Sequence, residues 1–560
     1  MPLMGSLYVG QSGLQTSQSA LNTTGHNITN ADTPGYVRQQ TMLGDKNYNL
    51  LSINTTGIAN KQTGLGVTYQ QIRQVRDVFL DKTYREENGR LSFYETQYET
   101  TSELETLLGE FEGASFENSL NNLWVSIQEL SKDPSSGVVQ GLVMQKAYAF
   151  MSDAQAVYQG MCNYQDNLNM EIKNTVDTIN DYGHRIYELN EQIRKIETGG
   201  FEHANDLQDE RNRLLDELSS FAKVSYSTDP EGNVLVKLED HVFVRPDRVS
   251  EMAVQVDETT SLYDVFWLDD APFKLDPNGH KIYDTDAAPV FLPGETISAQ
   301  LDTDLGKLKS MFLARGDHRA NFTDMETIRD ANGDIISTEA ENYAAVSGSV
   351  IMKYQAEFDR LVHSVVTAIN GALEEAYNEG DGEYMSNGHG GPLQIFRRKV
   401  SDDDVKEDYT KAETLFSVGN LSINRELLQT PGKLGYGDLS KPGFTRPDGS
   451  VDYTTAEKLK AVFDMAEYRL NPDSQTQLSI NSFYAGMVGE LANDGAVYKS
   501  NRDNEQITVD STESARQQVI GVSTDEELES MIRYQNAYNA SSRYINVVTE
   551  MLDHLLTSLG

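Results

Sequence analysis

Four oxygen-bearing side chains are spaced like the ligands of a calcium-binding loop: Asp330, Asn332, Asp334 and Glu341. Such a loop needs a glycine at its sixth position to make a sharp turn. That position holds Ile335, and the nearest glycine is displaced to Gly333. The pattern therefore favours a solvated turn over a calcium site, and we expect neither a metal nor a cofactor.

Other chemical motifs are weak or absent. The histidines include no His-x-x-x-His pair, and the chain has no Gly-x-Ser-x-Gly elbow, P-loop or cysteine cluster. Arg315-Gly316-Asp317 resembles an adhesion tripeptide, but three residues arise easily by chance. These patterns indicate no enzyme, although two carboxylates that meet only in the fold would escape a search for motifs.

Charge and composition exclude several classes of partner. The 560 residues include 46 Lys and Arg against 86 Asp and Glu, a net charge of -40. A nucleic-acid backbone or an anionic membrane surface would be repelled. No stretch approaches the roughly 18 apolar residues of a membrane span, so we expect no membrane insertion. The single Cys162 excludes an internal disulfide.

The first forty residues predict a helix of unusual character. Leu7, Leu14, Leu21 and Ile28 recur every seven residues, and the companion row of the heptad is small: Gly10, Ser17 and Thr24. Asp32 and Arg38 are the only formally charged side chains before residue 41. Pro34 and Gly35 suit the centre of a type II turn, so the helix should end a few residues earlier.

The last forty residues predict a stronger helix. Ser523 and Glu526 form a capping-box pattern at its start. One heptad row beyond it is Met531, Tyr538, Ile545, Leu552 and Leu559. The other row is Tyr534, Ser541, Val548 and Leu555. Together these rows make a nearly complete coiled-coil stripe.

Between the two ends, the sequence pattern changes from helical to alternating and back to helical. Long amphipathic helices are expected from about residue 75 to 196, with breaks at 109–113 and 133–137, and helices return from 307, 350, 456 and 479. From Val224 the pattern alternates and proline is frequent, which predicts a β-rich insertion. The fold class is thus mainly α with a β-rich inserted domain.

If the two ends pair, the domains must be discontinuous, each outer domain enclosing the next one in the sequence. The small row of the first helix would let Met531 and Tyr538 of the last one approach closely. We therefore expect a terminal coiled-coil domain of 1–45 plus 515–560, a helical rod-like middle domain of 46–222 plus 305–514, and a β-rich outer domain of 223–304 at the far tip. Because a pair of helices buries only a strip, we expect these ends to order on association with sibling molecules.

Both ends resemble one protein family. The segment "SLYVGQSGLQTSQSALNTTGHNITNADTPGYVRQQ" is similar to the N-terminal signature of the flagellar axial proteins, which comprise rod, hook and hook-associated proteins. The segment "GVSTDEELESMIRYQNAYNASSRYINVVTEMLDHLL" resembles the matching C-terminal element. Rod and hook proteins usually carry Gly-Asn-Asn ahead of the turn. This chain has Gly25-His26-Asn27 there, which resembles the sequence of the family members at the hook–filament junction.

The resemblance implies a structural function. It implies a non-enzymatic protein that is exported through the flagellar type III apparatus without a cleaved signal peptide and is located outside the cell at the hook–filament junction. The expected partners are the hook protein, the second junction protein, copies of the chain in a ring, and a cytoplasmic export chaperone at the C-terminal helix. The residues expected to form the assembly interface are Leu7, Leu14, Leu21, Asn27, Ile28, Asn30, Thr33, Pro34, Gly35, Tyr36, Met531, Tyr534, Tyr538, Ile545, Val548, Leu552, Leu555 and Leu559.

Two alternatives remain from the sequence. The first is the hook protein of the same family, which would self-assemble into long tubes rather than a ring. The second is an extracellular structural protein whose β insertion hydrolyses glycans, which incubation of the insertion with cell-wall glycans would reveal.

Overall fold

The protein is described from a computed structural model. The described residues are 3–46, 49–52, 61–109, 116–199, 203–229, 233–291, 297–330, 332–380, 382, 384–387, 390–400, 405–430, 432, 434 and 443–559.

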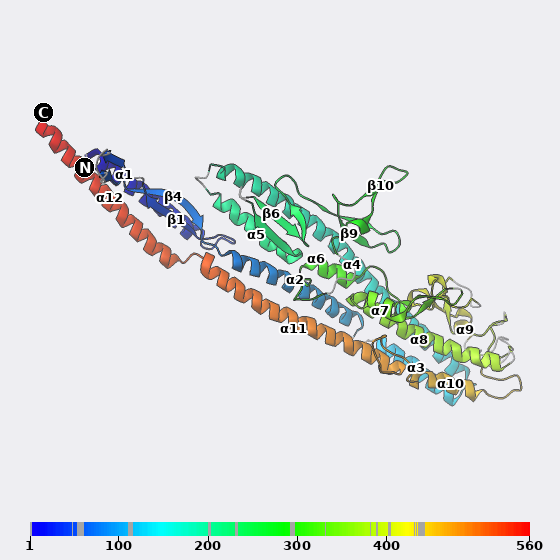
Figure 1. Ribbon diagram of the computed structural model, residues 1–560. Coiled ribbons are helices and arrows are strands. Elements are labelled where there is room, and N and C mark those ends of the chain that lie inside the picture. The colour runs from blue at the N-terminus through cyan, green and yellow to red at the C-terminus, as the bar shows by residue number, and fades with distance from the viewer. Residues whose placement is uncertain are drawn as a thin grey trace.

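The molecule is elongated, and both termini lie at the same end (Figure 1). There the first helix, α1 (Leu3–Thr29), packs against the last, α12 (Thr524–Leu559). Further along, α2 (Val78–Leu107) packs against α11 (Ile480–Ile520), so segments from opposite ends of the sequence run side by side. This pairing and the mainly α class confirm the fold expected from the sequence.

Helices make up most of the body. The α-helices between the two terminal pairs are α3 (Phe116–Lys132), α4 (Gly137–Glu197), α5 (Asn205–Phe221), α6 (Lys307–Arg315), α7 (Glu339–Val346), α8 (Val350–Glu379), α9 (Arg425–Gln429) and α10 (Tyr453–Asp464). The short 3-10 helices are η1 (Thr285–Ala287), η2 (Phe322–Met325), η3 (Ala412–Thr414) and η4 (Val418–Asn420). None of the helices within the described ranges combines the length and apolar content needed to cross a bilayer.

The longest helix, α4, organises the body. Its 61 residues would span roughly 90 Å, and they begin at the second of the two breaks expected from the sequence. Ile172, Ile179, Ile186 and Ile193 are all buried, because a seven-residue spacing keeps them on one face. After α4 ends, α5 folds back and packs along it.

All paired strands are antiparallel hairpins or ribbons, and the sheets are small. The strands are β1 (Gln39–Asp45), β2 (Asn49–Ser52), β3 (Lys61–Thr63), β4 (Val67–Gln74), β5 (Val224–Thr228), β6 (Val234–Leu238), β7 (His241–Val244), β8 (Met252–Val256), β9 (Tyr263–Trp267), β10 (Phe273–Leu275), β11 (Lys281–Tyr283), β12 (Ile328–Arg329), β13 (Ile335–Ser337), β14 (Phe396–Arg398) and β15 (Leu421–Ile423).

The β-rich insertion, β5 to β11, does not lie at the far tip, and this part of the prediction is wrong. Figure 1 shows it beside the middle of the molecule, while α9 and α10 lie at the end opposite the termini. Side-chain amides along α4 hold the insertion there. Asn169 Oδ1 accepts a hydrogen bond from the Tyr263 amide at 2.8 Å, Asn180 Nδ2 donates to the Met252 carbonyl at 2.8 Å, and Asn190 Nδ2 donates to the Val234 carbonyl at 2.9 Å.

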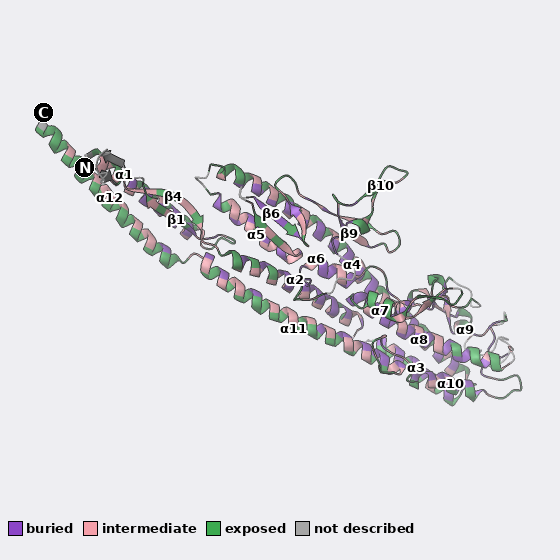
Figure 2. Ribbon diagram, viewed as in Figure 1, coloured by how far each residue is buried: buried purple, intermediate pink, exposed green. Residues whose placement is uncertain are grey.

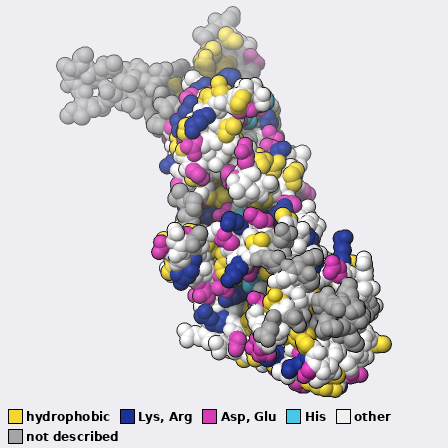
Figure 3. Space-filling view, turned by 90° about the vertical axis from the view of Figure 1, so that its right-hand side faces the viewer, with side chains coloured by type: hydrophobic (Ala, Val, Ile, Leu, Met, Phe, Trp, Pro, Cys, Tyr) yellow, Lys and Arg dark blue, Asp and Glu magenta, His cyan; other side chains and the backbone are white. Residues whose placement is uncertain are grey.

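Burial differs sharply between the two ends of the molecule. The main apolar core runs through α3, α4, α8 and α11 and includes Phe150, Phe358 and Phe483, and a smaller apolar cluster lies between η2, α7 and α8. By contrast, α12 is exposed along most of its length, as Figure 2 shows. On the face of the body shown in Figure 3, acidic and basic side chains are interspersed with apolar ones. The body is thus built around a buried apolar core, whereas α12 at the terminal end is mostly exposed.

Candidate assembly interface

The two terminal helices run antiparallel, and glycines set how closely they approach. A β-carbon added to Gly10 would lie 2.7 Å from Cγ1 of Ile545, and one added to Gly13 would lie 2.7 Å from Oγ of Ser541. Because both helices rise equally per residue, this register continues to place Ser17 opposite Tyr538 and Thr24 opposite Met531. The small row of α1 therefore faces α12, as the sequence pattern indicates.

The heptad rows of α12 face inward. Along this helix the half-buried positions include Met531, Tyr534, Tyr538, Ile545 and Leu552. Val548 is the most deeply buried apolar residue of α12, at 3% exposed. Leu555 is exposed, and the side chain of Leu559 lies outside the described part of the structure.

The leucine row of α1 is only half-buried. Leu7, Leu14, Leu21 and Ile28 all belong to this intermediate class. The deepest face of α1 is instead a row of small and polar residues at helical spacing: Ser12, Thr16, Ala20, Thr23 and Asn27. The sequence reasoning missed this row, although its regular spacing of three and four residues is a readable signal.

That polar row packs on the hairpin of β1 and β4. The Ser12 hydroxyl accepts a hydrogen bond from the Val67 amide at 3.3 Å, and the Thr41 hydroxyl donates to that of Thr23 at 3.0 Å. We call α1, the four strands β1 to β4 and α12 the terminal arm. It has three layers, with α1 between α12 and the hairpin.

Asn27 ties the end of α1 to the start of the hairpin. Its side chain is 1% exposed; Nδ2 donates to the Gln39 carbonyl at 2.9 Å, and Oδ1 accepts from the Gln39 amide at 3.0 Å. The same Oδ1 accepts from the Tyr36 hydroxyl at 2.8 Å. Burial, with the carboxylates of Asp206, Asp209 and Glu527, raises the pKa of Tyr36, so this hydroxyl remains a donor.

The turn between them has the expected geometry. Gly35 has a φ of 80°, which only glycine adopts readily, and the Tyr36 amide donates to the Thr33 carbonyl at 3.1 Å. Thr33, Pro34 and Gly35 are exposed, and Asn30 is half-buried, with its Nδ2 donating to the His26 carbonyl at 3.0 Å. Asn27 and Tyr36 therefore shape the turn, while Thr33, Pro34 and Gly35 present a surface.

An Asn27→Ala variant should loosen this turn. It leaves the buried Gln39 amide without a partner, which costs about 1–3 kcal/mol and should speed hydrogen exchange of that amide by about tenfold or more. Asn22→Ala is the matched control, because it makes the same substitution at an exposed position of α1. Equal exchange of the Gln39 amide in wild type and Asn27→Ala would contradict the role given to Asn27.

A polar joint connects the arm to the body. Arg38 forms ion pairs with Glu527 at 2.8 Å and Glu526 at 3.0 Å, and its amide donates to the Ile520 carbonyl at 2.9 Å. Beside it, the Val37 amide donates to Oδ2 of Asp209 on α5 at 3.2 Å. The segment between α1 and β1 therefore contacts both the start of α12 and α5, through residues 37 and 38.

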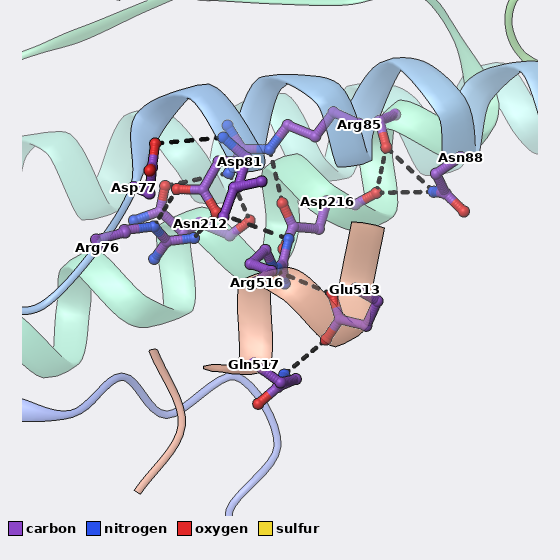
Figure 4. A network of polar contacts seen from close by, with 12 residues as sticks. Arg76, Asp77, Asp81, Arg85, Asn88, Asn212, Asp216, Glu513, Arg516 and Gln517 are labelled. Atoms are coloured by element: carbon purple, nitrogen blue, oxygen red, sulfur yellow. Dashed lines mark hydrogen bonds and ion pairs between the residues drawn. The ribbon is translucent and has the colours of Figure 1, made fainter. Parts of the chain in front are cut away.

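A second part of the joint anchors the end of α11. Figure 4 shows Arg516 reaching Asp216, which also receives Arg85 from α2. The Arg516 Nη2 to Asp216 Oδ2 distance is 2.8 Å, and the Arg85 Nε to Asp216 Oδ1 distance is 2.6 Å. The Arg516 guanidinium also lies 4.3 Å from the ring centroid of Tyr84. Sequence reasoning missed these residues, since nothing local in the sequence pairs them.

Asp209 gives the joint a pH dependence. Burial is the main cause that raises the pKa of Asp209 from the ordinary 3.8 to about 7. Hydrogen bonds from Val37 and Gln74 and the positive charge of Arg76 lower this pKa but do not cancel the effect of burial. The folded state thus binds a proton that the unfolded state releases. The resulting stabilisation is fully present below about pH 4 and is lost as pH rises through about 7.

Asp209→Asn should remove this dependence. We expect wild type to lose unfolding free energy relative to Asp209→Asn by on the order of 1 kcal/mol per pH unit between about pH 5 and pH 7. Denaturant unfolding of both proteins at several pH values measures the difference. A difference that is constant with pH would show that Asp209 is ionised in the folded protein.

The terminal arm exposes apolar side chains on its outside. Tyr544, Val547, Met551 and Leu555 are 42%, 47%, 54% and 42% exposed, and their spacing of three and four residues puts them on one face of α12. We call these four residues the outer stripe. Met4 and Tyr8 of α1 are also exposed, at 62% and 58%. Exposed apolar side chains grouped on one face are typical of surfaces that meet other proteins.

The other chemical candidates are accounted for within the fold. Arg315 is 1% exposed, and its Nη1 donates to Asn169 Oδ1 and the Tyr263 carbonyl, so the arginine of the adhesion tripeptide is buried, although Asp317 is exposed. Asp330 accepts from the amides of Asn332 and Asp334, and Glu341 caps α7 through Thr338. Within the described ranges, no three His, Cys, Asp or Glu side chains gather as a metal site.

Comparisons with known proteins converge on the bacterial flagellum. Residues 101–286 match the family described as "Flagellar hook-associated protein FlgK helical domain". Residues 7–36 match "Flagella basal body rod protein", and residues 517–558 match "Flagellar basal body rod FlgEFG protein C-terminal". The two terminal matches fall on α1 with its turn and on α12.

Curated relatives match along nearly the whole chain. Flagellar hook-associated protein 1 of Bacillus subtilis is 27% identical over 562 residues, which cover 99% of this chain and 98% of that protein. The Salmonella typhimurium protein of the same name is 24% identical over 576 residues, covering 97% and 98%. The solved structure of the flagellar hook junction protein FlgK from Burkholderia pseudomallei shares the fold, with a TM-score of 0.51 and 13% identity over 79% of this chain and 100% of that chain.

Proposed function

We propose that this chain, which is a structural flagellar hook-associated protein of the rod and hook axial family and a component of the hook–filament junction, assembles there as a ring of copies. The family is structural, and the chain is not an enzyme. Its similarity to hook-associated protein 1 along almost its full length supports a junction ring over the long tube of a hook protein.

The observation that carries this proposal is the terminal arm. It pairs α1 with α12 through glycines and leaves apolar side chains of both helices, such as Tyr8 and Met551, exposed. The exposed face of α1 is also nearly free of charge, so copies could stack without repulsion between like charges. In this proposal the predicted interface residues on α1 and α12, except the exposed Leu555, hold the arm together, and the outer stripe, which includes Leu555, meets neighbouring subunits.

The partners and the division into domains belong to the same proposal. The arm would contact the hook protein on one side of the ring and the second junction protein on the other. Before export without signal cleavage, a cytoplasmic chaperone would cover α12. With the boundaries expected from the sequence, the assembly domain would be 1–45 plus 515–560, the body 46–222 plus 305–514, and the outer domain 223–304. We propose to move the strands β2 to β4 from the body to the assembly domain, because β4 pairs with β1.

Deleting the gene tests this function. Cells that lack the chain should carry hooks without filaments and release flagellin into the medium, and the wild-type gene should restore filaments. Cells that form normal filaments without the chain would contradict a junction role. Cells that lack hooks altogether would favour the hook protein instead.

A further inference from the structure

A pocket of about 340 Å³ lies where α5, the β4–α2 linker and β5 meet. Its lining includes Arg76 of the linker, Arg211 of α5 and, on the exposed rim, Arg73 and His203. Asp81 is the only carboxylate among its lining residues. We call this site the guanidinium pocket. Its cationic lining stands out in a chain with a net charge of -40.

Arg211 is the central group of the guanidinium pocket. Its residue is 7% exposed, and Nη1 donates to Asn190 Oδ1 at 2.8 Å. Its Nε is buried without a hydrogen-bond partner, and among the described residues no carboxylate lies within 4 Å of the guanidinium. A buried cation with neither a counter-charge nor a full set of hydrogen bonds is costly, and an anion bound beside it would lower that cost.

Two neighbouring arginines have the same incomplete bonding. Arg76 is paired with Asp81 at 2.5 Å through Nε, and its buried Nη1 lies 3.9 Å from Oδ1 of Asp209 without making a hydrogen bond to any described residue. Arg85 is held by Asp216, and its Nη1 is also buried without a partner. Figure 4 shows these two arginines beside their carboxylates. The carboxylates of the joint therefore leave donors of both guanidiniums unused.

The electrostatics of Arg211 agree with this geometry. Its pKa is lowered to about 10, chiefly by burial; Glu197 opposes the shift, and Arg76 and Arg85 add to it. The three guanidiniums are thus near enough to repel one another. A bound anion would relieve both the repulsion and the loss of hydration.

We propose that the guanidinium pocket binds a small oxyanion, a phosphate or a carboxylate, through Arg211 and Arg76. The planar forks of guanidinium groups match the oxygen geometry of both anions, and charge-assisted hydrogen bonds to them are among the strongest in proteins. Arg73, which is exposed at the rim, adds a positive charge that attracts the anion. The bound anion connects α5 of the body to the linker that leads into the terminal arm.

Phosphorus NMR tests the site in the full-length chain. Inorganic phosphate added in chloride buffer at constant ionic strength should show line broadening that saturates with protein concentration. Acetate that competes would extend the ligand class to carboxylates, whereas acetate without effect would restrict it to phosphate. Wild-type protein that does not broaden millimolar phosphate, and whose melting temperature phosphate and acetate do not raise above chloride, would overturn the proposal.

Variants assign the binding to the pocket. Arg211→Gln should weaken phosphate binding by about tenfold or more. Arg185→Gln is the matched control, because Arg185 is exposed on α4 and pairs with Glu188 and Glu210 outside the pocket. The rim variant Arg73→Gln should weaken binding by about threefold without a risk to folding, because Arg73 is exposed. Equal affinity of Arg73→Gln and Arg185→Gln would place the binding elsewhere and reject the pocket.

Discussion

A Val548→Asp variant should keep a folded body but fail to join the flagellum. Val548 is 3% exposed in the interface between α12 and α1, where it faces Leu7 in the antiparallel register. Burying an aspartate there costs about 3 kcal/mol or more, in addition to the apolar area lost. Because two paired helices bury only a narrow strip of apolar surface, the pairing of α1 with α12 is only marginally stable. We therefore expect α12 of the variant to separate from α1.

Three measurements check this result. Circular dichroism and the melting of the purified variant report the body, which should remain as in wild type. Filament counts in cells report assembly, which should fall to the level of the deletion. Asn546→Asp is the matched control: it adds the same charge two residues away at an exposed position, and should assemble. Normal motility of Val548→Asp would contradict the role of the paired helices.

Leu552→Asp should act in the same direction with a smaller effect. Leu552 is half-buried and lies one turn closer to the end of α12, so solvent screens part of the added charge. Filament counts for both variants side by side should rank Val548→Asp below Leu552→Asp. The opposite order would show that burial within the single chain does not determine assembly.

The second large effect is expected at the joint. Replacing Arg516 with methionine should release the end of α11 from the body. Arg516 is 8% exposed, and its loss removes the ion pair with Asp216 and the stacking on Tyr84. Removing one partner of a buried ion pair typically costs 3–5 kcal/mol, which is about 3 kcal/mol here because Arg85 still compensates Asp216. Amide exchange after about residue 509 should accelerate strongly.

Arg502→Met provides the control on the same helix. Arg502 also stacks on a tyrosine, Tyr98, at 4.6 Å, but its ion pair is with the adjacent Asp503 and is partly exposed. We expect a cost below about 1 kcal/mol and no change in exchange at the joint. If both variants accelerate exchange equally, the buried pair is not what anchors α11.

The terminal helices could be predicted because their signal is local. The heptad rows of α12 and the small row of α1 recur at a fixed spacing, and most of their members face the partner helix. The start of α12 is equally local: the amide of Glu526 donates to the Ser523 hydroxyl at 3.4 Å, one of the two bonds of the predicted capping box. Pro34 and Gly35 fix the turn by their backbone preferences alone.

The features that escaped prediction depend on distant residues. The ion pair of Arg38 with Glu527 joins positions that are 489 residues apart, and no local pattern announces it. The position of the β insertion depends on asparagines spread along α4, which resemble ordinary surface residues in the sequence. The polar row of α1 was readable as a stripe, but its partner hairpin has only weak alternation.

The most direct test of the account is the accessibility of the outer stripe before and after assembly. The natural Cys162 is buried at 2% exposed, so a Met551→Cys variant provides a single reactive thiol. The account predicts rapid labelling of this thiol in the dilute monomer and strong protection in isolated hook–filament junctions. Labelling that is equally rapid in both states would show that this face of the terminal arm does not meet neighbouring subunits.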